Sequence, residues 1–125
     1  MELIDANIVL RFLLKDHAVL SARAADLLRD RQVVLLPEVL CEVVFVLEKV
    51  YGVGRAEIHR HVSAFLRAGS VLTPDQAVAL RALQEYRDSK LDIVDSLLLA
   101  YHAVHRHAVH TFDKGLDRCL KRASA

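Results

Sequence analysis

The sequence predicts an α/β protein in which a parallel sheet is covered by helices on both faces. Short apolar runs rich in β-branched residues alternate with longer segments of helical periodicity, which is typical of that class. Hydrophobic residues make up 54% of the 125 residues and charged residues 26%, a balance found in compact globular proteins rather than disordered ones. At this length we expect one domain, residues 1–125, with one substantial core.

Four short apolar runs are the expected strands. Residues 2–4 open the chain, and residues 33–36 form a β-rich run bounded by Pro37. The third and fourth strands are expected at residues 71–73 and 108–111. Because ligand sites in parallel sheets lie beyond the carboxyl ends of the strands, residues that directly follow these runs are candidates for a functional site.

The segments between these runs carry helix boundary signals. Asn7 is an expected N-cap, Pro37 suits the first turn of a helix, and Gly52 and Gly69 suit helix ends. The expected helices cover residues 7–15, 21–30, 37–51, 55–68, 75–89, 92–105 and 114–122.

Charge and cysteine content narrow the function classes. A formal net charge of +1 and a pI near 7.9 exclude a strongly basic coat, yet they leave room for a local basic patch. Two cysteines, Cys41 and Cys119, form no disulfide framework and are expected to be reduced thiols. The first residues lack the pattern of a secretory signal, and no apolar run approaches the ~20 residues that span a bilayer. We therefore expect a soluble, cytoplasmic protein without a membrane partner.

Four acidic residues, Asp5, Glu42, Asp95 and Asp113, each interrupt an otherwise apolar stretch. Asp5 and Asp113 directly follow expected strands and should share one edge of the sheet. Two carboxylates 4 Å apart repel by roughly 4 kcal/mol at an effective dielectric constant near 20, so four together require protons or a cation. Oxygen ligands favour Mg²⁺ or Mn²⁺ over Zn²⁺. The pattern predicts metal-dependent hydrolysis of a phosphodiester.

Each acid also has a simpler interpretation. Glu42 could lie at the margin of an apolar helical face, and Asp5 could merely end a strand. Asp95 could take part with Asp92 in a capping arrangement that the helix dipole favours. Asp113 could merely begin the last turn. The metal hypothesis depends on the coincidence of all four.

At these residues the chain resembles the PIN-domain ribonucleases, most of all the VapC toxins of bacterial toxin–antitoxin pairs. The resemblance implies a three-layer α/β/α sandwich with a central parallel sheet of four or five strands. The fifth strand is in doubt because the sequence ends soon after Asp113. Four segments carry the likeness in the order that the family shows, at Leu3–Leu10, Leu40–Leu47, Asp92–Leu98 and Thr111–Lys114.

The resemblance also implies roles for individual residues. Asn7 would orient Asp5 or a bound water, Thr111 would contact the metal shell or Asp113, and Asp92 would either join the site or cap its helix. The substrate would be RNA, cleaved to 5′-phosphate and 3′-hydroxyl products, and the partners would be a second copy of the chain and a small antitoxin that covers the site. The acids that would bind Mg²⁺ or Mn²⁺ are Asp5, Glu42, Asp95 and Asp113.

Other residues suggest weaker hypotheses. Arg11 and Lys114 are the preferred phosphate contacts among the basic residues near the acids. A zinc site at His102, His105, His107 and His110 would need convergence that their expected elements do not provide. The apolar faces around Leu10, Leu14, Val44, Leu47 and Tyr51 are interpreted as core, with a partner surface as the alternative.

Two other functions are compatible with parts of the pattern. Asp5 after the first strand would suit an aspartyl-phosphate phosphatase, although that chemistry usually needs a second acid where Asn7 stands. A non-catalytic partner-binding domain would have no reason to keep four mutually repulsive acids. The metal-dependent endoribonuclease of a toxin–antitoxin pair is therefore the principal hypothesis.

Overall fold

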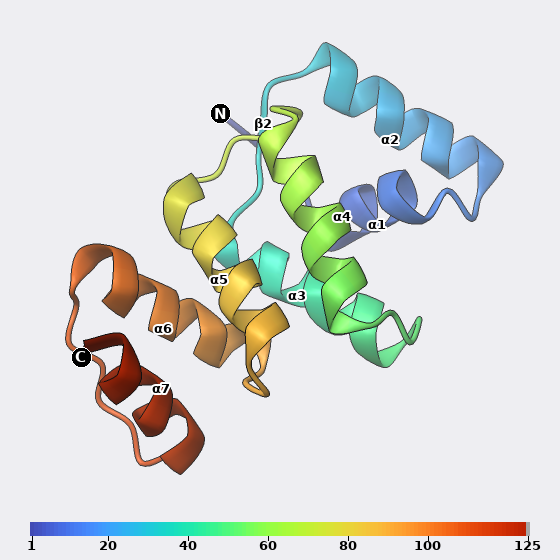
Figure 1. Cartoon of the computed structure of the whole chain (residues 1–125). Helices are drawn as coiled ribbons and strands as arrows, with labels where there is room; N and C mark the ends of the chain where they lie inside the picture. The colour runs from blue at the N-terminus through green and yellow to red at the C-terminus, as the bar shows by residue number, and fades with distance from the viewer. Residues whose placement is uncertain (125) are drawn as a thin grey trace.

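A computed structural model describes residues 1–124, and most of this part of the chain is helical (Figure 1). Every expected helix forms, with ends within about three residues of the expected ones. No helix in the described range is both long enough and apolar enough to cross a membrane. The helices are α1 (Ala6–Leu14), α2 (Ala18–Asp30), α3 (Pro37–Lys49), α4 (Arg55–Arg67), α5 (Gln76–Asp88), α6 (Ile93–His105) and α7 (Lys114–Ser124).

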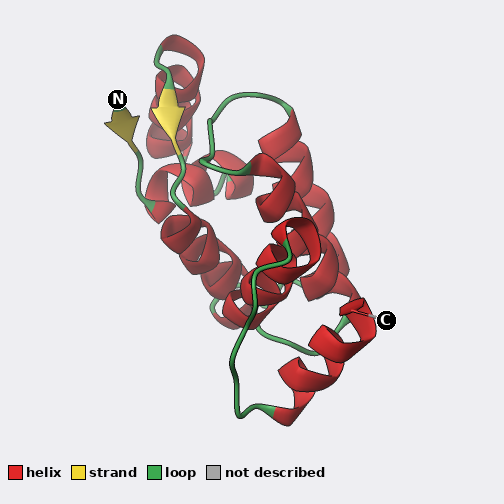
Figure 2. Ribbon diagram, turned by 90° about the vertical axis from the view of Figure 1, so that its left-hand side faces the viewer, coloured by secondary structure: helices red, strands yellow, loops and turns green. Residues whose placement is uncertain are grey.

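The sheet is small. Strands β1 (Glu2–Leu3) and β2 (Val33–Val34) pair in parallel, with Glu2 opposite Val33. On the other side of β2, Leu72 makes a single parallel bridge with Val34. Figure 2 shows the two short strands at the periphery of a molecule that is otherwise built from helices and loops.

The expected sandwich around a sheet of four or five strands is therefore wrong. Residues 71–73 supply only the bridge at Leu72, and residues 108–111 form no strand. In that loop Val109 packs against Leu99 of α6, Leu116 and Leu120 of α7, and Leu91. The carbonyl of His107 is hydrogen-bonded to Nδ1 of His102 at 2.9 Å. These local contacts replace strand pairing, so helices pack mainly on helices.

The main core lies between α1, α3, α4 and α5. Val9, Val43, Ile58 and Leu83 are completely buried there and pack with residues of β2. Leu10, Val44 and Leu47 are also buried, as the sequence interpretation had it, whereas Tyr51 is exposed. The last helix, α7, packs on α6 at one end of the molecule (Figure 1).

The side chain of Arg55, at the start of α4, joins α4 to the C-terminal end of α5 and to the α5–α6 connection. Its Nη1 donates to the carbonyl of Tyr86 at 2.8 Å and also to the carbonyls of Ser89 and Leu91. The guanidinium lies over the Tyr86 ring, 4.2 Å from its centroid, and the Tyr86 hydroxyl donates to Glu48. Arg55 is therefore a structural residue, because its Nη1 donates to carbonyls that close the α5–α6 connection.

Candidate functional site

Three of the candidate site acids are helix N-caps. Asp5 Oδ1 accepts from the amide of Ile8 at the start of α1, at 3.2 Å. Asp92 Oδ1 accepts from the amide of Asp95 at the start of α6, at 2.8 Å. Asp113 Oδ2 accepts from the amide of Leu116 in the first turn of α7, also at 2.8 Å. Each carboxylate is thereby held near the positive end of a helix dipole, and its second oxygen lies outside the cap bond.

The start of α6 gathers three carboxylates into one neighbourhood. Asp95 is half-buried in the first turn. Burial raises the pKa of Asp95, and the negative charges of Asp92 and Asp113 raise it further. Packing places the same segments side by side, since Leu91, next to Asp92, clusters with Leu116 of α7, and a Cβ at Gly115 would contact both Asp113 Oδ2 and Leu91. We call Asp92, Asp95 and Asp113 the acidic cluster.

The acids of α3 approach the same region from another side. Cys41 is half-buried, and its thiol pKa is raised first by burial and then by the charges of Asp92 and Glu38. Cys41 therefore lies near Asp92, and Glu38 and Glu42 stand one helical turn apart on the exposed side of α3, on either side of Cys41 in the sequence. The sequence prediction missed Glu38, although its position four residues before Glu42 was a signal that both share a face.

The acids are more exposed than the apolar residues beside them in the sequence had led us to predict. Asp5, Glu42 and Asp113 are exposed, and only Asp95 is half-buried. Apolar neighbours such as Val43 and Val44 point into the core while Glu42 faces outward, because successive helical residues lie on different sides. Asp113 also does not follow a strand as expected, since the loop before it forms none.

The donor chemistry of the acidic cluster fits a hard cation. All its ligands would be carboxylate oxygens, which suit Mg²⁺ or Mn²⁺, and a cation would relieve the repulsion at Asp95. Gly115 also leaves space beside Asp113, since a Cβ there would stand 3.3 Å from Asp113 Oδ2. The ligand shell is not closed, however: in residues 1–124 no three His, Cys, Asp or Glu side chains lie close enough to hold a metal.

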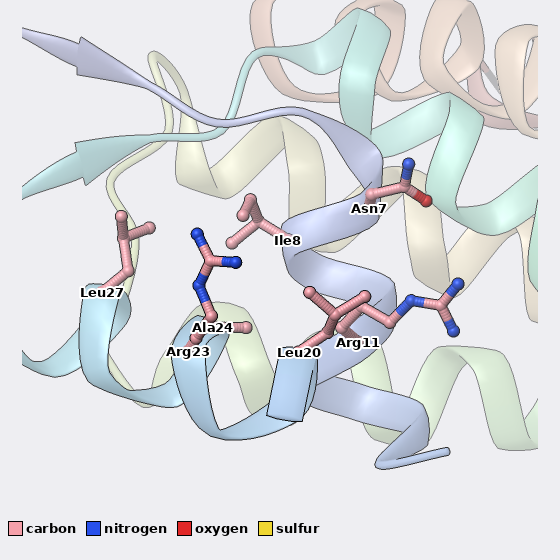
Figure 3. Close-up of a pocket in the computed structure, with 7 residues that line it drawn as sticks. All are labelled: Asn7, Ile8, Arg11, Leu20, Arg23, Ala24 and Leu27. Carbon is pink, nitrogen blue, oxygen red and sulfur yellow. The ribbon is translucent and has the colours of Figure 1, made fainter. Parts of the chain in front are cut away.

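Two polar residues flank the acids. The amide of Asp113 donates to Thr111 Oγ1 at 3.0 Å, so Thr111 contacts the backbone of that acid. Asn7 is exposed in the first turn of α1 and lines a cavity between α1 and α2 (Figure 3). Neither Asp5 nor Glu42 is joined to the acidic cluster by a hydrogen bond in the described part of the chain.

The basic side chains near the acids differ in whether they already form ion pairs. Arg11 Nη1 donates to both oxygens of Asp16, at 2.9 and 2.8 Å, so its charge is partly neutralised. Lys114 is exposed at the first position of α7, directly after Asp113. Arg23 on α2 was not among the sequence candidates, because nothing in the sequence places α2 beside α1.

The histidines make other contacts instead of converging. His105 Nε2 lies 2.6 Å from Asp75 Oδ2, and His102 Nε2 lies 2.6 Å from Ser124 Oγ. The rings of His105 and His107 are 5.7 Å apart and stack loosely beside Tyr101. These side chains serve the packing of α6 with α5 and α7.

Comparison with known proteins adds one positive finding. Residues 3–120 match the sequence model of the PIN domain, which covers the four acids, strand β2 and helices α1 to α6 in full. Proteins with this domain are generally nucleases that act on RNA and usually bind divalent metals. No curated protein and no solved structure gave a match.

Proposed function

The chain belongs to the PIN-domain family, and from this premise we propose that it is a Mg²⁺- or Mn²⁺-dependent endoribonuclease, the toxin of a VapC-type toxin–antitoxin pair. The acidic cluster supports the proposal, because Leu91 packs on Leu116 and so brings the start of α6, with Asp92 and Asp95, next to the start of α7, with Asp113. Asp5 and Glu42 would complete the ligand set, from the start of α1 and the second turn of α3.

The residues of the site would contribute by orientation and charge. When bound, the cation would supply an activated water and would stabilise negative charge on the phosphate oxygens. The cap bonds to Asp92 and Asp113 fix one oxygen of each carboxylate and leave the other for a ligand. Thr111 accepts from the Asp113 amide, and Lys114 would contact an RNA phosphate while Asn7 would orient Asp5 or a water.

The partner proposals concern a second copy of the chain and an antitoxin. We propose a homodimer and a cognate antitoxin from the likeness of the motif set to VapC toxins. Exposed apolar side chains on two neighbouring helices, α3 and α6, offer a surface for either partner. These are Phe45, Val94 and Leu98, which are 58%, 53% and 39% exposed.

The test compares purified wild type with Asp95→Asn on a labelled RNA in the presence of Mn²⁺. Substitutions outside the ligand shell of a metal reduce activity by up to about 100-fold. We expect Asp95→Asn to reduce RNA cleavage by more than that, because it removes a ligand charge at the centre of the acidic cluster. Asp26→Asn, an exposed acid on α2, is the matched control and should cleave as wild type does. Equal cleavage by all three proteins would overturn the proposal.

A further inference from the structure

A cavity of about 270 Å³ lies between α1 and α2, next to the first turn of α1 (Figure 3). This volume is slightly below the about 300–1,000 Å³ typical of small-molecule pockets, so the cavity suits a fragment rather than a large ligand. Its wall is mostly apolar. The apolar lining residues are Ile8, Leu20, Ala24 and Leu27.

The polar lining groups are all suited to a nucleotide. Asn7 brings an amide, and Arg11 and Arg23 bring guanidinium groups, while no acid lines the cavity. Arg11 is paired with Asp16, but Arg23 is exposed and forms no ion pair with any residue in 1–124. In Figure 3 the guanidinium of Arg23 extends over the cavity toward Ile8, whereas that of Arg11 points away.

Other arginines on or next to α2 already form ion pairs. Arg29 pairs with Asp26 and Asp30, and Arg31 pairs with Glu2, at distances from 2.9 to 3.1 Å. The cavity beside them is lined by these paired charges and so offers an anion little net attraction. Of the two surfaces, only the α1–α2 cavity combines an unpaired guanidinium with an apolar wall.

We propose that this cavity is a subsite for one nucleotide of single-stranded RNA, with Arg23 as a binding residue for its phosphate or base. An unstacked base needs a planar partner for its face, such as an aromatic ring or an arginine guanidinium, and a hydrogen-bonding group at its edge, and its phosphate needs a cation. The cavity has no aromatic ring, so the Arg23 guanidinium would cover the base or bind its phosphate, Asn7 would reach the base edge, and the aliphatic wall would keep water from the base. This inference rests on the proposed ribonuclease function, because Asn7 lies two residues after Asp5 and the subsite would therefore hold a nucleotide next to the cleaved one.

The test measures binding without cleavage, so that it does not depend on the metal chemistry. A fluorescent RNA oligonucleotide is titrated in EDTA with Asp95→Asn protein, alone and with Arg23→Ala or Arg67→Ala added. Arg67 is the matched control, an exposed arginine on α4. We expect Arg23→Ala to weaken binding by about tenfold and to reduce the salt dependence by about one phosphate contact, with Arg67→Ala unchanged.

A photocrosslink identifies the surface directly. RNA that contains 4-thiouridine should crosslink to peptides of α1 or α2 that include Ile8, Leu20 or Leu27, and Arg23→Ala should reduce that yield. Equal binding by the Arg23 and Arg67 variants, or crosslinks only to other helices, would overturn the subsite and would point to a protein partner for the cavity. If wild type fails to cleave RNA but these binding results hold, the ribonuclease proposal fails while the RNA subsite stands.

Discussion

Asp92 allows the capping role and the metal role of an acid to be separated. Its Oδ1 accepts the amide of Asp95 at 2.8 Å, which is an N-cap bond of α6. Asparagine caps helices about as well as aspartate does, whereas alanine has no acceptor. Asp92→Asn therefore keeps the cap and removes the charge, while Asp92→Ala removes both.

The expected changes in stability follow from whether each variant keeps this N-cap bond. Loss of an N-cap acceptor costs about 1 kcal/mol, so Asp92→Ala should lower the unfolding free energy by about that much and Tm by about 4 °C for a domain of this size. Asp92→Asn should stay within about 0.5 kcal/mol of wild type. It also relieves the repulsion that helps to raise the pKa of Asp95.

The assay pairs thermal unfolding with Mn²⁺-dependent RNA cleavage for both variants. We expect both to lose cleavage by at least about tenfold, although only the alanine variant loses stability. Asp75→Asn is the matched control, since Asp75 caps α5 through the amide of Val78 and lies outside the acidic cluster. Full cleavage by Asp92→Asn would refute a ligand role for Asp92 and leave it as a cap alone.

Two further predictions concern stability. Arg55→Ala should lower the unfolding free energy by about 1–3 kcal/mol in urea denaturation, because it removes the Nη1 donor that the Tyr86, Ser89 and Leu91 carbonyls share; an unchanged midpoint would contradict this role. The pKa of Asp75 is lowered, first by the hydrogen bond from His105 and then by that from the Val78 amide. The ionised Asp75 carboxylate therefore stabilises the folded protein above about pH 4, and this stabilisation is lost as the pH falls below that value. Between pH 7 and pH 3, Asp75→Asn should therefore lose less unfolding free energy than wild type does. Equal losses would contradict a stabilising pair of Asp75 and His105.

The helices could be predicted because their signals are local. Pro37, Asp75 and Asp92 mark helix starts, and Gly52 and Gly69 take positive φ after helix ends. Helix α2 starts three residues before the expected Ser21 because the ring of His17 caps it, accepting from the amide of Leu20 at 3.1 Å. A histidine cap is uncommon, so the sequence offered no clear signal for it.

The sheet and the site depend on contacts between distant segments. An apolar run such as residues 108–111 has strand propensity, but it becomes a strand only if a partner strand is beside it, and here α6 and α7 take up its contacts. The order of the four acids along the chain was legible in the sequence. Their exposure was not, because Val43 and Val44, the apolar residues directly after Glu42, belong to the buried side of its helix.

The most direct test of the metal proposal is a crystal of the protein soaked in Mn²⁺ and measured for anomalous scattering. We expect one strong peak within about 2.5 Å of carboxylate oxygens from the acidic cluster, joined by Asp5 or Glu42 once the cation draws the side chains together. A data set with no such peak, or with manganese bound only to the histidines of α6, would contradict the idea that these acids form a cation site.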